Sequence, residues 1–368
     1  MAKNLWILVI VATSFFIYGL GVGVYHVFPY DIIIEIKHSI LNENNDSVQF
    51  EILTSDVKSL IHISNQTDID NKRSSLIKYI WKNDSIPNHQ PNSIEMNIID
   101  DRYDLPNIDS IDKITISMEY DVESISYLFH PKTPNNRLII YQEGHTGDFI
   151  NGKKTIQYFL EKNYTVLAFS MPLTGLNNQP VINDPNFGII KFDIHEKFKF
   201  LDSDDFSPIS YFVEPIWVSL NYLDKNYDFE SYDFIGLSGG GWTAVIYGAI
   251  DDRISKTFSV AGSAPFYLRT NENFGDYEQN VINLYRIANY LELYTMDSHG
   301  ENRELVQIFN KYDPCCFSGD LYLDYESVVS NKVNSLGPGS FKIFIDDSHH
   351  EHKISERSLE IILESLEN

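Results

Sequence analysis

Hydrophobic and polar positions follow a strand-and-helix rhythm from residue 113 to the C-terminus. Residues 113–120 (KITISMEY) and 123–129 (ESISYLF) alternate as half-buried antiparallel strands do. Beyond them, short apolar runs predict buried strands, and longer runs with apolar residues three or four apart predict helices. The predicted buried strands are 137–142, 164–170, 232–237, 254–262, 304–310 and 341–346, and the predicted helices are 148–163, 209–226, 240–250, 327–333 and 353–366. This alternation is typical of an α/β fold, a mostly parallel central sheet covered by helices on both faces.

Two long stretches interrupt this rhythm, residues 171–209 and residues 264–300. Long insertions that follow the strands of such a sheet usually cover an active site. We therefore expect both stretches to be cap insertions over the domain 113–368.

The N-terminal segment 5–28 has no Asp, Glu, Lys or Arg. A helix of that length crosses a bilayer, whose apolar core needs about 20 residues. Trp6 and Tyr25 stand near its two ends, where amphipathic rings prefer to sit. A cleaved signal peptide would have a shorter apolar stretch and a small-residue cleavage site. The segment is therefore expected to be an uncleaved single-pass transmembrane anchor.

The flanking charges set the expected orientation. Lys3 and the terminal amine precede the anchor, whereas Asp31 and Glu35 offset Lys37 after it. Because positive charge favours the cytoplasmic side, the catalytic domain is expected outside the cytoplasm. Residues 31–112 are polar and asparagine-rich at first, and are expected to form a juxtamembrane stalk or extension.

Composition narrows the possible functions. Hydrophobic residues make up 43% of the chain, with 23 Tyr and 23 Phe, which suffices for a compact core. The formal net charge of −24 repels phosphate backbones, so no nucleic-acid partner is expected. The two cysteines are neighbours, Cys315 and Cys316, and are expected to act as packing residues.

The strongest chemical signal is Gly236-Leu237-Ser238-Gly239-Gly240, between a predicted strand and a predicted helix. That context turns a loose G-x-S-x-G match into a nucleophile elbow, with Ser238 as the nucleophile. Side chains two residues either side of the serine would collide with the strand or the helix, so glycine is expected there. The alternatives are an ordinary glycine-rich turn and a phosphate-binding loop, but no G-x-x-x-x-G-K-[ST] motif is present.

A serine hydroxyl needs a histidine to take its proton and a carboxylate to orient that histidine. In chain order, Asp313 follows the predicted strand 304–310, and Asp320, Asp324 and Asp297 are its rivals. After the last strand, His352 leads directly into the final helix and is the preferred base. His349 and His350 remain alternatives, since the sequence does not separate the three.

The oxyanion formed in acyl transfer needs backbone donors. Gly239, the residue after the nucleophile, supplies one N–H. The loop Gly144-His145-Thr146-Gly147 follows the predicted strand 137–142, and His145 or Thr146 is expected to supply the second. A plain glycine turn is the alternative. The histidines near the C-terminus lack the H-E-x-x-H spacing of a metal site, so no metal and no cofactor are expected.

These motifs make residues 113–365 resemble the α/β-hydrolase superfamily, in particular its serine esterase and dienelactone-hydrolase-like branches. The matching motifs are the elbow GLSGG, the loop EGHTG, the acid turn KYDPCCF and the terminal DSHHEHKIS. The resemblance implies an eight-stranded sheet with a cap and hydrolysis through an acyl-enzyme.

The expected function is a membrane-anchored serine hydrolase that cleaves a carboxylic ester, or a related acyl bond, of a small-molecule or lipid-like acyl substrate. Two alternatives stand beside it. One is a membrane-tethered binding module that keeps the fold without turnover, and the other is an acyltransferase that uses the same triad.

Overall fold

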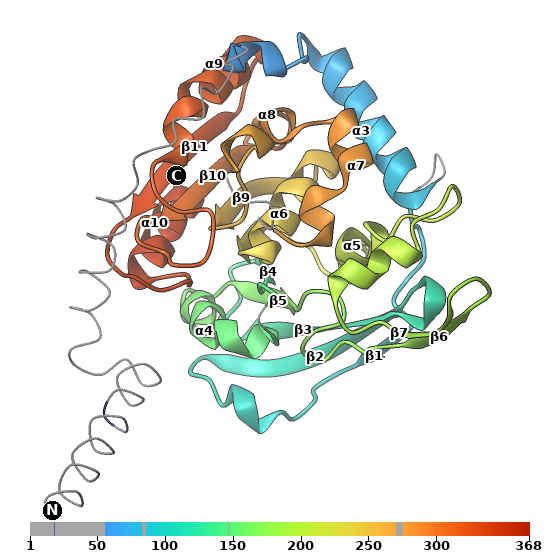
Figure 1. Ribbon diagram of the computed structural model, residues 1–368. Coiled ribbons are helices and arrows are strands. Elements are labelled where there is room, and N and C mark those ends of the chain that lie inside the picture. The colour runs from blue at the N-terminus through green and yellow to red at the C-terminus, as the bar shows by residue number, and fades with distance from the viewer. Residues whose placement is uncertain (1–17, 19–55, 83–85, 146, 270–274) are drawn as a thin grey trace, which may run out of the picture. The chain divides into compact units, whose positions relative to one another are not determined.

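The computed structural model describes residue 18 and residues 56–82, 86–145, 147–269 and 275–368 (Figure 1). The chain divides into two units, Met1–Thr54 and Ser55–Asn368, and the central sheet lies in the second. The expected anchor at 5–28 lies outside the described residues except for Tyr18. Among the helices of the described ranges, none combines the length and the apolar character that crossing a membrane requires.

A nine-stranded sheet forms the centre of the second unit, in the order β1-β2-β3-β5-β4-β8-β9-β10-β11 (Figure 1). The strands β1, β2, β3 and β5 pair antiparallel, and every pairing from β5 to β11 is parallel. The prediction of a mostly parallel sheet entered by antiparallel strands is confirmed. The strands are β1 Ser93–Glu95, β2 Ile108–Ser117, β3 Glu123–Pro131, β4 Arg137–Gln142, β5 Thr165–Phe169, β8 Ser231–Leu237, β9 Ile254–Val260, β10 Glu304–Asn310 and β11 Ser340–Asp346.

Helices cover both faces of this sheet, because its inner strands are apolar on both sides. One apolar core contains buried residues of α4 and α10, and the other contains buried residues of α3, α5, α6, α8 and α9. The predicted coverage of both faces is confirmed. The helices are α3 Gln66–Trp81, α4 Lys153–Glu161, α5 Ser210–Asn226, α6 Gly239–Ile250, α7 Ile282–Ile287, α8 Tyr290–Ser298, α9 Glu326–Leu336 and α10 Glu356–Glu367.

The expected stalk 31–112 differs from what the structure describes of it. Its boundary at residue 113 falls inside β2, and the compact unit already begins at Ser55. Helix α3 buries Ile69, Leu76 and Ile80 in the larger core, and β1 pairs with β2 as the ninth strand. The apolar spacing in α3 is that of an amphipathic helix, which needs a core to cover it. The domain is therefore longer at its N-terminal end than the resemblance implies.

The two expected cap insertions have different structures. The first carries the hairpin of β6 (Val181–Asp184) and β7 (Gly188–Lys191), where Phe187 and Ile189 are exposed. The second carries α7 and α8, and every residue of α8 is buried. Helix α8 is thus part of the core rather than a cap, because it is buried on all of its faces.

Candidate active site

Ser238 occupies the turn between β8 and α6, with φ 55° and ψ −122°. A non-glycine residue at positive φ is strained and persists only where the surroundings enforce it. Two backbone hydrogen bonds do so here, because Ser238 N–H donates to the Val260 carbonyl at 2.8 Å and Trp242 N–H donates to the Ser238 carbonyl at 3.0 Å. The side chain of Ser238 is therefore held at the carboxyl end of the sheet.

Glycine is required on both sides of this serine. A Cβ added to Gly236 would lie 2.1 Å from the Gly240 carbonyl oxygen, and one added to Gly240 would lie 2.1 Å from the Gln142 carbonyl oxygen. Both obstacles are backbone atoms, which cannot move aside without breaking the strand or the helix. The close packing of β4, β8 and α6 that produces the turn thus explains the G-x-S-x-G pattern.

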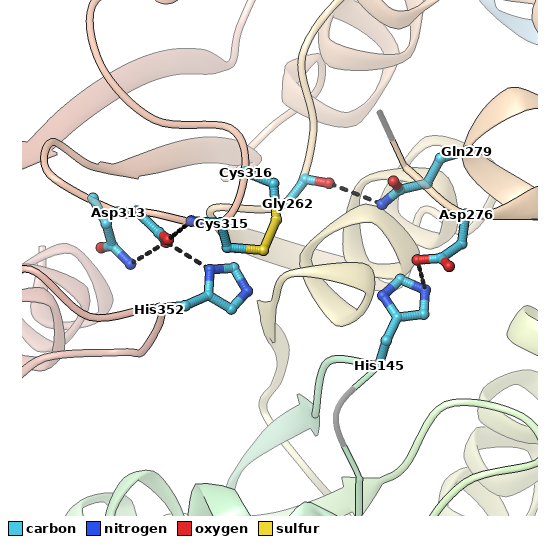
Figure 2. The surroundings of a disulfide bond; sticks show 9 residues. His145, Gly262, Asp276, Gln279, Asp313, Cys315, Cys316 and His352 are labelled. Atoms are coloured by element: carbon cyan, nitrogen blue, oxygen red, sulfur yellow. Dashed lines mark hydrogen bonds and ion pairs between the residues drawn. A yellow bond between two sulfur atoms is a disulfide. The ribbon is translucent and has the colours of Figure 1, made fainter. Parts of the chain in front are cut away.

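Asp313 and His352 lie in contact on the loops after β10 and β11 (Figure 2). His352 Nδ1–H donates to Asp313 Oδ2 at 2.6 Å, and the Asp313 side chain is fully buried. The Cys315 N–H donates to the other oxygen, Oδ1, at 2.8 Å. The carboxylate accepts the hydrogen bond from Nδ1–H, so the neutral ring carries its proton on Nδ1. His352 Nε2 then has a lone pair that can accept a proton.

The structure separates the three histidines that the sequence leaves equivalent. His350 is exposed and stacks on Tyr312 with ring centroids 4.7 Å apart. His349 Nε2 lies 3.5 Å from Asp346 Oδ2, and its Nδ1 accepts the Glu351 N–H at 3.1 Å. In the described ranges, His352 is therefore the histidine of this loop that is oriented by Asp313.

The rival carboxylates are also separated. Asp320 and Asp324 are exposed, and Asp297 is buried against Thr257, from which it accepts a hydrogen bond at 2.9 Å. Burial raises the pKa of Asp297 to about 7, against the opposing effects of Arg303 and Thr257. None of these three has a hydrogen bond to an imidazole among the described residues.

The loop that carries His352 is held by Asp346, the last residue of β11. Asp346 Oδ1 accepts hydrogen bonds from Ser348 N–H at 3.0 Å and Ser348 O–H at 2.6 Å. Its Oδ2 accepts the hydroxyls of Ser355 and Ser358, the latter at 2.7 Å. Burial raises the pKa of Asp346, but these hydrogen bonds outweigh burial and lower it to about 2. The ionised carboxylate therefore joins both ends of the loop.

The predicted oxyanion loop lies beside Ser238. A Cβ added to Gly144 would lie 2.9 Å from Ser238 Cβ, so glycine lets the loop approach this closely. Gly144 N–H donates to Glu143 Oε1 at 2.9 Å, and Tyr141 O–H donates to Glu143 Oε2 at 2.7 Å. Gly239, at the first position of α6, directly follows Ser238. Thr146 lies outside the described residues, so of the two expected second donors the structure describes His145.

Burial raises the pKa of Glu143, although the hydrogen bonds from Tyr141 and Gly144 and the nearby His352 act in the opposite direction. In the described part of the chain, no hydrogen bond joins the Ser238 hydroxyl to an imidazole. Catalytic hydrogen bonds are often long or poorly aligned before substrate binds.

Two residues of the insertions join the site without a signal in the sequence. Glu278 is fully buried, and its two carboxylate oxygens lie 2.7 Å from His145 Nε2 and 3.1 Å from His195 Nδ1. Burial raises the pKa of Glu278, but the two imidazoles outweigh it and hold that pKa well below its ordinary value. Neither residue belongs to a recognisable motif, because each stands in an irregular segment whose partners lie far away in the chain.

Cys315 and Cys316 form a disulfide between neighbouring residues, where the sequence predicts two packing cysteines (Figure 2). Their sulfur atoms and an imidazole nitrogen of His352 lie within 4.8 Å of one another. The disulfide therefore lies near the imidazole and directly follows the turn that carries Asp313.

Comparisons with known proteins bear on the fold. No family model and no curated protein sequence matches the chain. An acetyl xylan esterase from Paenibacillus sp. R4 superposes with a TM-score of 0.55 and 14% identity, over 84% of this chain and 97% of the other. Acetyl xylan esterase 1 from Thermoanaerobacterium sp. JW/SL YS485 gives 0.54 and 13%, over 82% and 93%. The Pyrococcus furiosus esterase Pf2001 gives 0.50 and 13%, over 76% and 97%.

These similar structures belong to the α/β-hydrolase superfamily, and the chain has the α/β-hydrolase fold. The predicted resemblance is confirmed at the level of the fold, with β1 as an additional strand.

The contact between His145 and Gly239 gives a first prediction. A Cβ at Gly239 would lie 2.3 Å from the His145 ring, so Gly239→Ala should displace the oxyanion loop. Loss of one oxyanion donor typically lowers kcat by about 10²- to 10³-fold. Steady-state kinetics on an activated ester measures this loss. The control is Ile189→Ala in the β6–β7 hairpin, where the side chain is exposed. Equal activity of both variants would contradict the assigned geometry.

The lowered pKa of Asp346 gives a second prediction. A carboxylate with a depressed folded-state pKa stabilises the protein above its unfolded pKa and loses that effect as the pH falls from about 4 through about 2. Asp346→Asn should therefore reduce the free energy of unfolding at neutral pH by about 2 kcal/mol. Urea unfolding measures the difference, which should shrink toward pH 2.

The neighbouring Asp347 is exposed and provides the matched control for Asp346. Asp347→Asn should unfold at the same urea concentration as the wild type at every pH. A difference between wild type and Asp346→Asn that stays constant from about pH 5 to pH 2 would show that the carboxylate charge does not hold this loop.

Proposed function

We propose that the chain is a serine hydrolase that cleaves a carboxylic ester through Ser238, His352 and Asp313. The observation that carries the proposal is the combination of a strained Ser238 turn with an imidazole that Asp313 orients on the loop after β11. The esterases of similar fold support the reaction class. Ordinary glycine-rich turns have no need of a serine at positive φ, whereas a nucleophile elbow does.

In the proposed reaction, His352 Nε2 takes the proton from Ser238 as Oγ forms a bond to the carbonyl carbon of the ester. The resulting oxyanion accepts hydrogen bonds from the N–H groups of Gly239 and His145. The bond to the alcohol oxygen then breaks, and His352 returns its proton to the leaving alcohol. Water repeats the sequence on the acyl-enzyme and releases the carboxylic acid and the free serine.

Asp313 makes this proton transfer directional. Its hydrogen bond to Nδ1–H leaves Nε2 as the basic nitrogen and stabilises the imidazolium that forms in each step. The backbone N–H of Cys315 and the side chain of Asn310, which lies 3.4 Å from Oδ2, fix the carboxylate in turn. The acid is thus held by three donors from three parts of the chain.

The proposed substrate carries a short acyl group. Ser238 is only 8% exposed, so little of its surface is open to a substrate. Two of the similar structures are named as acetyl xylan esterases, and a further one is named as a methylesterase, with a TM-score of 0.54. These points favour a small-molecule ester over the lipid-like acyl chain that the sequence allows.

Serine-directed labelling gives the third prediction. A fluorophosphonate probe should label the wild type, and Ser238→Ala should abolish labelling and lower kcat/KM for an acetyl ester by about 10⁴-fold or more. Ser259→Ala is the matched control, since Ser259 is buried nearby and its hydroxyl has no partner among the described residues. Persistent labelling of Ser238→Ala would end the proposal.

The same probe tests the choice of base. His352→Asn should abolish labelling, whereas His349→Asn and His350→Asn should retain most of it. Loss of labelling in either control, together with retention in His352→Asn, would assign the base elsewhere. Wild-type protein that binds ester but never turns it over would favour a binding module with this fold.

We also propose that residues 5–28 anchor the chain in a membrane, with the hydrolase outside the cytoplasm. The support is the absence of Asp, Glu, Lys and Arg from this segment. In the fourth prediction, the full chain should stay in the membrane fraction after alkaline carbonate washing, and a chain that begins at Ser55 should not. Release of the full chain by carbonate would contradict the anchor.

A further inference from the structure

A cluster of nitrogen and oxygen atoms lies beside the proposed triad and takes no part in it. His145 comes from the loop after β4, His195 from the first insertion, and Glu278 from the second. One ligand atom of each lies within 4.8 Å of the others. Asp276 joins them, with Oδ2 3.1 Å from His145 Nε2, as Figure 2 shows. Three separate segments of the chain thus direct ligand atoms to one place.

The two ring nitrogens of His195 both face acceptors. Its Nε2 lies 2.8 Å from the Pro172 carbonyl oxygen, which can only accept, so Nε2 carries a proton. In the neutral ring, Nδ1 then presents a lone pair to Glu278 Oε2 at 3.1 Å. Two lone pairs at that distance repel each other unless a positive charge lies between them. Either a second proton or a metal ion supplies that charge.

His145 meets the same condition from the other side. Its Nε2 faces Glu278 Oε1 at 2.7 Å and Asp276 Oδ2 at 3.1 Å. A single N–H points well at only one of two acceptors, whereas one cation contacts the nitrogen and both oxygens. Glu278 and His195 are buried, and burial makes an uncompensated carboxylate costly.

We propose that His145, His195, Glu278 and Asp276 bind a zinc ion. Zinc takes imidazole nitrogen and carboxylate oxygen at about 2.0–2.2 Å in tetrahedral sites, where ligand atoms lie about 3.3 Å apart. The three ligand pairs in contact, at 2.7 to 3.1 Å, need to open by a few tenths of an ångström, and the ligand atoms of His145, His195 and Glu278 all lie within 4.8 Å of one another. The Pro172 carbonyl accepts a hydrogen bond from the other ring nitrogen of His195, as the groups that orient zinc-bound imidazoles do.

A zinc ion at this place would connect both insertions to the oxyanion loop. The His145 ring packs against Gly239, since a Cβ there would lie 2.3 Å from the ring. Fixing the imidazole therefore fixes the backbone that follows Gly144. The zinc proposal rests only on these ligands, so it does not depend on whether Ser238 is the nucleophile.

Metal content is the direct test. The full chain is stripped with a chelator, dialysed and titrated with zinc chloride, and bound zinc is measured by elemental analysis. Cobalt(II) replacement gives a second readout, because tetrahedral cobalt absorbs strongly in the visible range. We expect one zinc per chain, a higher Tm with zinc, and at least ~100-fold weaker binding in Glu278→Gln and His195→Gln.

Two controls separate this site from others. His89→Asn removes an exposed histidine that lies 3.6 Å from Glu214, and should leave zinc binding unchanged. Replacing both Cys315 and Cys316 by serine removes the sulfur atoms near His352, which among the described residues make a second possible metal-binding group once their disulfide is reduced. That double variant should also keep its zinc, and so should Ser238→Ala.

The zinc proposal can be contradicted with wild-type protein alone, so the test does not depend on the folding of any variant. Stripped wild type that takes up no zinc and shows no change in Tm would overturn the proposal, leaving protonated imidazoles as the charge beside Glu278. Loss of zinc in the double cysteine variant would overturn it as well, because the metal would then belong to the other group.

Discussion

The backbone of Ser238, held at positive φ between β8 and α6, is the constraint on which the proposed site depends. It holds Ser238 between the end of β8 and the start of α6, with Gly239 as the next residue. The turn exists only because Gly236 and Gly240 let the strand, the helix and the end of β4 approach to backbone contact. Side chains at these positions would separate the nucleophile from the oxyanion loop. The packing of three elements thus determines the chemistry.

A second regularity arises from the parallel sheet. The loops after β4, β8, β10 and β11 leave the same edge, so residues distant in the chain meet there. Buried carboxylates hold these loops: Glu143 bonds the oxyanion loop, Asp313 orients His352, and Asp346 joins both ends of the histidine loop. Glu278 does the same for the insertions through two imidazoles. Glu143, Asp313 and Asp346 are compensated by hydrogen bonds, as burial requires, and Glu278 faces two imidazoles.

The parts that the sequence predicts well are those with a local cause. The strands β4 and β10 begin and end as their apolar runs indicate, and the elbow follows from glycine spacing. No local pattern distinguishes His349, His350 and His352, because all three lie in the same loop after the last strand. The structure distinguishes them through tertiary contacts with Tyr312, Asp346 and Asp313. Likewise, α3 joins the core through contacts with helices that are distant in the chain. The polar sequence on either side of α3 gives no indication of these contacts.

Trapping the acyl-enzyme tests the role of Ser238 most directly. Wild-type protein is mixed with p-nitrophenyl acetate, quenched in acid during turnover, digested and examined by mass spectrometry. We predict an acetyl group on the peptide that contains Ser238, formed as the first equivalent of nitrophenol is released. Turnover of the ester without this adduct, or with the acetyl group on another residue, would contradict Ser238 as the nucleophile.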